Sequence, residues 1–120
     1  MKRLVLAAAA LLALATPALA QFVNYPATPT KPGGYLPLGG AQFALSVSSA
    51  TALTVPTGAV WATICVEGQA VRYRDDGTNP TASTGMPIAS GACIAYAGNL
   101  AAIKFIAQTG SPTIDVIYYQ

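Results

Sequence analysis

The sequence contains no histidine, and charged residues make up only 8% of it. Without histidine the chain lacks the commonest general base and the commonest transition-metal ligand. Serine and threonine then have no evident base to activate them as nucleophiles. We therefore predict no catalytic residue, no metal site and no cofactor, and we do not expect an enzyme.

Carboxylates are equally scarce, and only Glu67, Asp75, Asp76 and Asp115 occur. Two of them could in principle form a glycosidase pair. The adjacent Asp75 and Asp76, however, precede a glycine, and aspartates at turns typically bond their own backbone. A calcium site built from Asp75, Asp76, Thr78 and Asn79 is a further alternative, but the stretch lacks the alternating ligand spacing of a calcium loop.

The positive charges are few as well. Two of the six Lys and Arg residues, Lys2 and Arg3, lie in the N-terminal segment that is interpreted below as a signal peptide. Without that segment the chain carries four cations and four carboxylates and is formally neutral. A neutral, charge-poor surface argues against nucleic-acid binding, which needs clustered cations. It also leaves little charge to oppose self-association.

A signal peptide is predicted over residues 1–20. Lys2 and Arg3 are followed by an apolar run over residues 4–15, a proline at 17 and the sequence Ala-Leu-Ala. This is the pattern of a secretory leader, with cleavage expected before Gln21. The apolar run is short for a membrane span, although an uncleaved anchor is the alternative. We expect an exported protein, periplasmic or secreted, with no membrane span after cleavage.

Only two cysteines are present, Cys65 and Cys93, and both lie in the exported part. In an oxidising compartment an even pair usually forms a bridge. Two free buried thiols are the alternative. Both cysteines lie opposite the aliphatic stripe of their segments, so a disulfide on one outer face of a sheet is allowed if the two Cα atoms lie within about 7 Å.

Residues 21–40 differ in composition from the rest of the chain, because they contain four prolines and four glycines. Proline fixes φ and removes a backbone donor, so neither a helix nor a central strand fits here. We interpret this segment as an extended arm. A solvated tail is the simpler form of that interpretation, and an arm that packs on a neighbouring subunit is the other.

From residue 41 to 120 apolar and polar residues alternate with period two, which predicts half-buried strands. In 42–48 the apolar face is Phe43, Leu45 and Val47, and in 59–67 it begins at Val60. Residues 86–91 look like a turn region. A helix over 101–108 is the one competing prediction. The expected strands are 42–48, 51–55, 59–67, 70–74, 92–97, 101–109 and 113–119. Seven short strands with turn residues between them predict an all-β fold, a single small antiparallel β-sandwich or jelly roll.

The most informative stretch is VRYRDDGTNPTASTGM, residues 71–86, which leaves a strand and enters a polar loop. Arg72 and Arg74 share one strand face and could hold a carboxylate or phosphate. Ion pairs with nearby carboxylates, which would fix the direction of the loop, are the simpler interpretation. The candidate partner-binding residues are Arg72, Tyr73, Arg74, Asp75 and Asp76.

Aromatic side chains offer an alternative site. Trp61, Tyr73 and the terminal pair Tyr118-Tyr119 could form a sugar-stacking platform. A secreted domain of this kind would use Trp61 or Tyr73 together with Asp75 or Asp76. Aromatic residues at strand spacing are more often core residues or cross-strand pairs.

The run from Leu53 to Tyr119 resembles small all-β proteins encoded in tailed-phage and prophage genomes. The recurring pattern is Val66-Glu67-Gly68, then residues 71–87, then Gly98-Asn99-Leu100, then Ile103 to Ile106, and a final strand that ends in Tyr118-Tyr119. The resemblance implies an accessory role in a phage head or tail, and it supplies no catalytic residue. The leader and the two cysteines depart from the pattern, which leaves an exported relative as an equal alternative.

Together these observations predict a non-enzymatic structural or interaction module that binds a protein partner or itself. Its surface would use residues 72–83 together with the arm. The alternative is a secreted carbohydrate-binding or weakly hydrolytic domain, for which a glycan would be the partner.

Overall fold

The structure is a computed structural model that describes residues 34–120. The predicted signal peptide and most of the predicted arm lie outside the described residues. Within 34–120 every regular element is a strand. The strands are β1 (Gln42–Ser46), β2 (Thr51–Ala52), β3 (Trp61–Glu67), β4 (Val71–Arg74), β5 (Met86–Ile88), β6 (Cys93–Tyr96), β7 (Lys104–Ala107) and β8 (Thr113–Tyr119).

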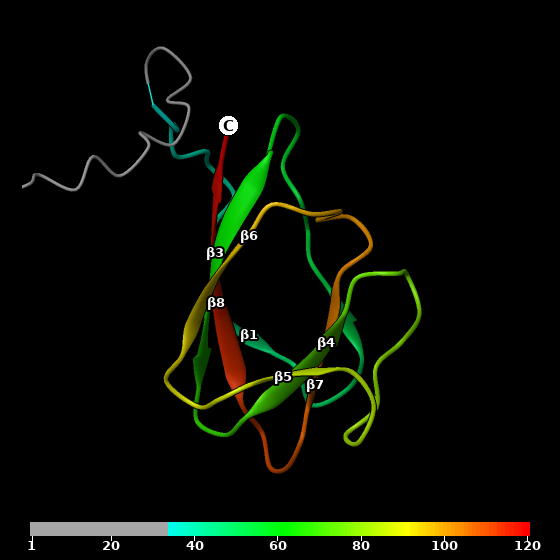
Figure 1. The fold of residues 1–120 in the computed structure, drawn as a ribbon. Coiled ribbons are helices and arrows are strands. Elements are labelled where there is room, and N and C mark those ends of the chain that lie inside the picture. Colours follow the sequence, from blue (N-terminus) through cyan, green and yellow to red (C-terminus); the bar gives the residue numbers. More distant parts are fainter. Residues whose placement is uncertain (1–33) are drawn as a thin grey trace, which may run out of the picture.

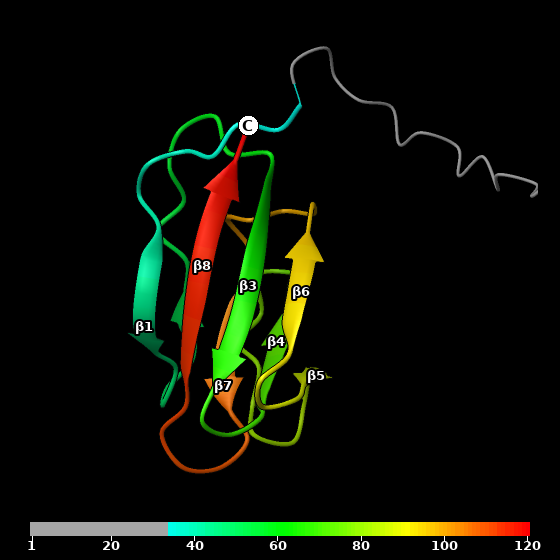
Figure 2. The ribbon, with the colours of Figure 1, turned by 90° about the vertical axis from the view of Figure 1, so that its left-hand side faces the viewer.

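The strands form two four-stranded antiparallel sheets that face each other (Figure 1). One sheet has the order β1-β8-β3-β6, which Figure 2 shows from its outer face, and the other has the order β2-β7-β4-β5. The first strand therefore pairs with the last, the second with the seventh, the third with the sixth and the fourth with the fifth. This is one long antiparallel hairpin rolled into two layers, the strand order of a jelly roll. The all-β prediction is confirmed.

The core lies between the two sheets and follows the period-two pattern of the sequence. Ala62, Ile64 and Val66 of β3 are buried, while the residues between them are half-buried on the outer face. Strand β8 alternates in the same way. The largest fully buried side chains from these and the facing strands are Tyr118, Phe105, Ile64, Ile103, Ile114 and Val116. Alternation places one apolar face of each strand against the other sheet, and burying that face stabilises the fold.

The predicted apolar face of the first strand is wrong in part. Phe43 is 66% exposed, whereas Val47 is fully buried. The pairing of β1 with β8 is irregular between Gln42 and Leu45, and Ala44 has a positive φ of 51°. The Ala44 amide donates to Asp115 Oδ1 at 2.7 Å instead of to the ladder. An extra residue in one strand reverses the side-chain alternation on one side of the bulge, so Phe43 points to solvent.

Three other sequence expectations are corrected. Val60 precedes β3 and is 51% exposed, so it does not belong to the core face. Residues 86–91 are not only a turn, because Met86–Ile88 forms the edge strand β5 beside β4. The second strand is only Thr51–Ala52. Residues 104–107 form a strand rather than the competing helix, as the alternation of Lys104 and Phe105 indicated.

Tyr118 is fully buried, and its hydroxyl has a polar partner. It donates to Gln42 Oε1 at 2.7 Å, and the same oxygen accepts the Thr54 amide at 3.0 Å. Burial raises the pKa of Tyr118 to about 12. In the unfolded chain the pKa of tyrosine is near 10. The stabilisation that comes from keeping the buried hydroxyl protonated is therefore fully present below pH 10 and is lost as the pH rises through about 12.

The end of the predicted arm lies against its own sheet. Leu36 exchanges backbone hydrogen bonds with Gln120, and the Leu38 amide donates to the Tyr118 carbonyl at 2.8 Å. Residues 36–38 therefore continue the sheet beside the end of β8 (Figure 2). The last residues of the predicted arm therefore belong to the sandwich.

The predicted disulfide is confirmed. Cys65 of β3 and Cys93 of β6 are directly opposite each other, with Cα atoms 4.0 Å apart, and their sulfurs are bonded. The bridge lies on the outer face of the sheet, where the alternation of both strands placed it, and it ties the edge strand β6 to the sheet. A disulfide is consistent with an oxidising, exported environment.

Candidate functional site

The most elaborate surface feature is the β4–β5 loop, residues 75–85, an eleven-residue connection between adjacent strands. It carries the turn residues of the VRYRDDGTNPTASTGM stretch. Pro80 is buried and anchors the middle of the loop. Gly85 has a φ of 130°, and a Cβ there would lie 2.7 Å from the Tyr73 carbonyl oxygen, so only glycine fits where the loop rejoins the sheet.

Arg72 braces the second half of this loop. Its Nε donates to the Ala82 carbonyl at 3.0 Å, and one terminal nitrogen donates to the Gly85 carbonyl at 2.8 Å. Arg72 lies on the outward side of β4, so its planar fork reaches both carbonyls without entering the core. The guanidinium therefore holds the loop's own backbone.

Lys104 braces the first half from the neighbouring strand. Its Nζ donates to the Gly77 carbonyl and to Asn79 Oδ1, both at 2.9 Å. Lys104 is directly opposite Arg74 in the β4–β7 pair. One ammonium thus fixes a turn that is more than twenty residues earlier in the chain, which no local pattern indicates.

Arg74 pairs with Asp76, one of the ion pairs expected with Asp75, Asp76 or Glu67. The corresponding expectation for Arg72 is wrong, because its guanidinium bonds backbone carbonyls instead. Asp76 also accepts the Thr78 amide at 3.0 Å, which closes the turn on itself. The Arg74 side chain and then the Thr78 amide lower the pKa of Asp76 to about 2. The pair is therefore intact above the ordinary pKa of aspartate and is lost as the pH falls through about 2. Because both side chains are well exposed, the pair orients the loop more than it stabilises the fold.

Asp75 and Tyr73 connect the start of the loop to the sandwich. The Tyr96 hydroxyl donates to Asp75 Oδ2 at 3.1 Å. The Tyr73 ring meets Tyr96 edge-on, with ring centroids 6.4 Å apart, and packs at a tilt against the buried Phe105, with centroids 6.1 Å apart. Tyr73 thus packs against the core. Partial burial, followed by the bond to Asp75, raises the pKa of Tyr96 above 10.

The five predicted partner-binding residues are therefore all at one end of β4, but most of their polar atoms face the loop. Every cation within residues 34–120, namely Arg72, Arg74 and Lys104, makes a hydrogen bond to the β4–β5 loop. What faces solvent is the loop they hold. Besides Asp75, Asp76 and Asn79, its exposed side chains are Thr78, Thr81, Ala82, Ser83 and Thr84, and Met86 is exposed beside them.

Most of the residues proposed as calcium ligands already accept hydrogen bonds from side chains of the protein. Asp76 forms an ion pair with Arg74. Asp75 accepts a hydrogen bond from Tyr96, and Asn79 accepts one from Lys104. A cation at this position would displace an ammonium and a guanidinium from the same oxygens. In the described part of the chain, no three acidic or cysteine side chains gather where they could hold a metal ion.

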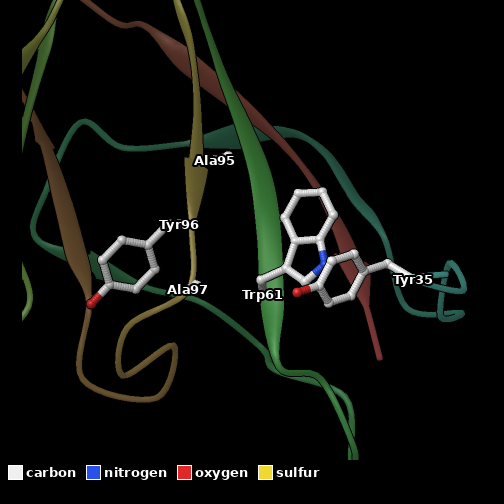
Figure 3. Close-up of a pocket in the computed structure, with 5 residues that line it drawn as sticks. All are labelled: Tyr35, Trp61, Ala95, Tyr96 and Ala97. Carbon is white, nitrogen blue, oxygen red and sulfur yellow. The ribbon is translucent and has the colours of Figure 1, made fainter. Parts of the chain in front are cut away.

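A second feature lies on the outer face of the other sheet. Trp61 stacks on Tyr119, with ring centroids 4.1 Å apart and planes 8° apart, and Tyr35 meets it edge-on at 5.3 Å. Beside this aromatic cluster is a shallow, mostly apolar hollow of about 240 Å³, lined by Tyr35, Trp61, Ala95, Tyr96 and Ala97. Figure 3 shows the two alanines on β6 and the chain just after it, with Tyr96 directed away from Trp61.

The alternative sugar platform is not assembled as the sequence suggested. Trp61 belongs to the outer face of one sheet, and Tyr73 belongs to the opposite sheet and packs toward the core. Asp75 and Asp76 lie with Tyr73, not with Trp61. Of the predicted platform, Trp61 and Tyr119 do lie together, because the register of β3 with β8 places them opposite each other. Tyr35 was not singled out, because only the pairing of the arm with β8 brings it beside Trp61.

Comparison of the chain with protein families, with curated proteins and with solved structures finds no match. No helix in residues 34–120 is long and apolar enough to cross a membrane.

Proposed function

We propose that this chain is a non-enzymatic interaction module that presents the β4–β5 loop to a protein partner. The observation that carries the proposal is the convergence of Arg72, Arg74 and Lys104 on one exposed loop. Solvent-exposed loops usually remain mobile, and ordering one costs conformational entropy. A loop that is already ordered before binding avoids that cost when a partner docks.

The chemistry of the loop indicates the class of partner. Its exposed side chains are the carboxylates of Asp75 and Asp76, the Asn79 amide, several hydroxyls and the small Ala82, with the thioether of Met86 beside them. Asp76 is paired with Arg74, and Asp75 accepts a hydrogen bond from Tyr96. The nearby cations are directed to the backbone carbonyls of the loop, to Asn79 and to the Asp76 carboxylate, so little positive charge is offered to phosphates. Such a surface suits a protein face better than a nucleic acid. This surface fits an accessory of a phage particle, the role that the resemblance implies. It fits equally an exported relative, the alternative that the predicted leader and the two cysteines raise.

A carbohydrate-binding role has less support. A sugar ring needs an open aromatic face with hydrogen-bonding groups beside it. Trp61 is stacked against Tyr119 on one side and met by Tyr35, and the hollow beside it is mostly apolar.

The experiment is a comparison of two arginine substitutions on the exported protein. Ala82→Arg adds a bulky side chain to the exposed loop without removing a brace, because only the Ala82 carbonyl is used by Arg72. Ser111→Arg adds the same side chain to the exposed turn after β7, at the far end of that strand from Lys104. Each protein is immobilised and exposed to the exported fraction of the source cells and to a glycan array.

We expect at least one protein to be retained by the unmodified chain and by Ser111→Arg but to be retained tenfold less by Ala82→Arg. Circular dichroism and thermal unfolding of both variants provide the control for folding. If Ala82→Arg retains the same proteins to the same extent, the proposal is wrong. Binding of a defined glycan that is lost with Trp61→Ala would instead favour the carbohydrate alternative.

A further inference from the structure

The four strand edges of the sandwich are not equally protected. β1 is interrupted by the bulge at Ala44, β2 has two residues, and β5 has Pro87 at its centre. Bulges, short strands and proline are the features that prevent an edge from pairing with another chain. β6 has none of these features. It is a regular four-residue strand with no charge, and Figure 2 shows it at the outer edge of its sheet.

Backbone groups along β6 are open to a further strand. Cys65 and Cys93 face each other with Cα atoms 4.0 Å apart, the close spacing of a pair whose peptide groups do not bond each other. The Val66 amide donates to the Ala92 carbonyl next to this pair, in keeping with the alternation. The peptide groups of Cys93 and Ala95 therefore point away from β3, toward the open edge. One strand placed beside β6 would bond to all of them.

The aromatic hollow lies on the outer face of the same edge. Ala95 and Ala97 lie beside Trp61 but fill little space, which leaves the hollow over their side chains (Figure 3). A strand paired to β6 places its own side chains about 5 Å from those of β6. A large aromatic side chain on that strand would lie across the alanines and contact Trp61. The edge thus offers both backbone bonds and a pocket for one ring.

The sequence of the arm contains a segment with these properties. Residues 21–25, QFVNY, include no proline and are rich in strand-forming residues. Phe22 and Tyr25 are three positions apart, so in a strand they point to opposite faces. Whichever face is turned outward, one aromatic ring is available for the hollow. We propose that residues 21–25 of one copy pair with β6 of a second copy, with Phe22 or Tyr25 against Trp61.

Residues 26–32, the spacer between residues 21–25 and the sandwich, favour pairing between two copies. Prolines occur at 26, 29 and 32, a spacing that favours an extended polyproline conformation of about 3.1 Å per residue. Seven such residues extend about 20 Å. Tyr35, where the arm meets the sandwich, contacts Trp61 on β3, the strand next to β6. A spacer extended over that length would carry residues 21–25 beyond the copy's own β6, which is why we assign the pairing to a neighbouring copy. Such a head-to-tail contact repeats from copy to copy.

The test uses two complementary variants of the exported protein. Ala95→Pro removes only the amide that points to the open edge, a place where an edge strand tolerates proline, so this copy keeps its arm but loses its acceptor edge. Phe22→Ser with Tyr25→Ser keeps the acceptor edge but removes the rings of the arm. Phe43→Ala, on the opposite edge of the same sheet, is the matched control. Masses are measured by sedimentation across concentration, and folding is checked by circular dichroism.

We expect the unmodified protein and Phe43→Ala to exceed the mass of one chain increasingly with concentration. Each of the two other variants alone should remain at the mass of one chain, and an equimolar mixture of them should form a complex of two chains. A monomeric unmodified protein overturns the proposal, as does assembly by either variant alone or a mixture that stays monomeric. None of these outcomes depends on the β4–β5 loop, so the proposal can fail while the proposed function stands, and the reverse also holds.

Discussion

Replacing both Cys65 and Cys93 by alanine should lower the free energy of unfolding by about 3.5 kcal/mol. This is the loop-closure contribution expected for a bridge with this separation in sequence. The two residues are 28 positions apart, and reduction frees that length of chain in the unfolded state. For a domain of this size the melting temperature should fall by roughly 14–28 °C. The effect is measured by denaturant and thermal unfolding of the chain that begins at Gln21.

Thr63→Ala is the control, because Thr63 and Ala95 form the next cross-strand pair on the same face without a covalent bond. That variant should lose well under 1 kcal/mol. The unmodified protein treated with a reductant should unfold like the double cysteine variant. A double variant as stable as the unmodified protein would show that the bridge contributes nothing to the fold.

Phe105→Ala should destabilise the protein by about 3–5 kcal/mol, the usual cost of removing a buried ring. Phe105 is fully buried in the core, where it contacts Tyr73. The matched substitution is Phe43→Ala, which the period-two pattern alone would place in the core as well. Because Phe43 is 66% exposed, its loss should cost less than about 0.5 kcal/mol.

Urea unfolding of the two phenylalanine variants measures the difference directly. Equal destabilisation by the two substitutions would mean that the bulge in β1 is misplaced and that Phe43 belongs to the core. A small effect of both would mean that the two sheets do not pack through Phe105.

The sequence predicted those parts of the fold where one face of a strand is continuously apolar. In β3 and β8 the alternation runs without interruption, and burial of Ile64 and Val116 follows it. The same alternation placed Cys65 and Cys93 on one outer face, which made their pairing predictable. In β1 the pattern failed, because the Ala44 amide is satisfied by Asp115, a residue 71 positions away. A bulge stabilised by so distant a side chain leaves no local signal.

The candidate site was predictable only in its local contacts. The Arg74–Asp76 pair joins residues two positions apart and was expected from the turn sequence. Lys104 was not expected at the loop, since its position there follows from the pairing of β4 with β7. The aromatic hollow likewise depends on the pairing of β3 with β6 and on the placement of Tyr35 beside Trp61.

The central claim is that side chains from two strands hold the β4–β5 loop in one conformation before a partner binds. Hydrogen–deuterium exchange of its amides tests this directly in the unmodified protein, in Arg72→Met and in Lys104→Met. Methionine keeps much of each side-chain stem but removes the donors. Glu67→Gln, which changes an exposed charge at the end of β3, is the control for a loss of charge alone.

We expect the amides of Thr78 and Thr84, which donate to Asp76 and to Thr81, to exchange more slowly in the unmodified protein than in an unstructured peptide of the same sequence. Arg72→Met should accelerate exchange at Thr84, and Lys104→Met should accelerate it at Thr78, each by tenfold or more. Exchange in β3 and β8 should be unchanged. Exchange at unstructured rates in the unmodified loop, or no acceleration in either methionine variant, would contradict the account.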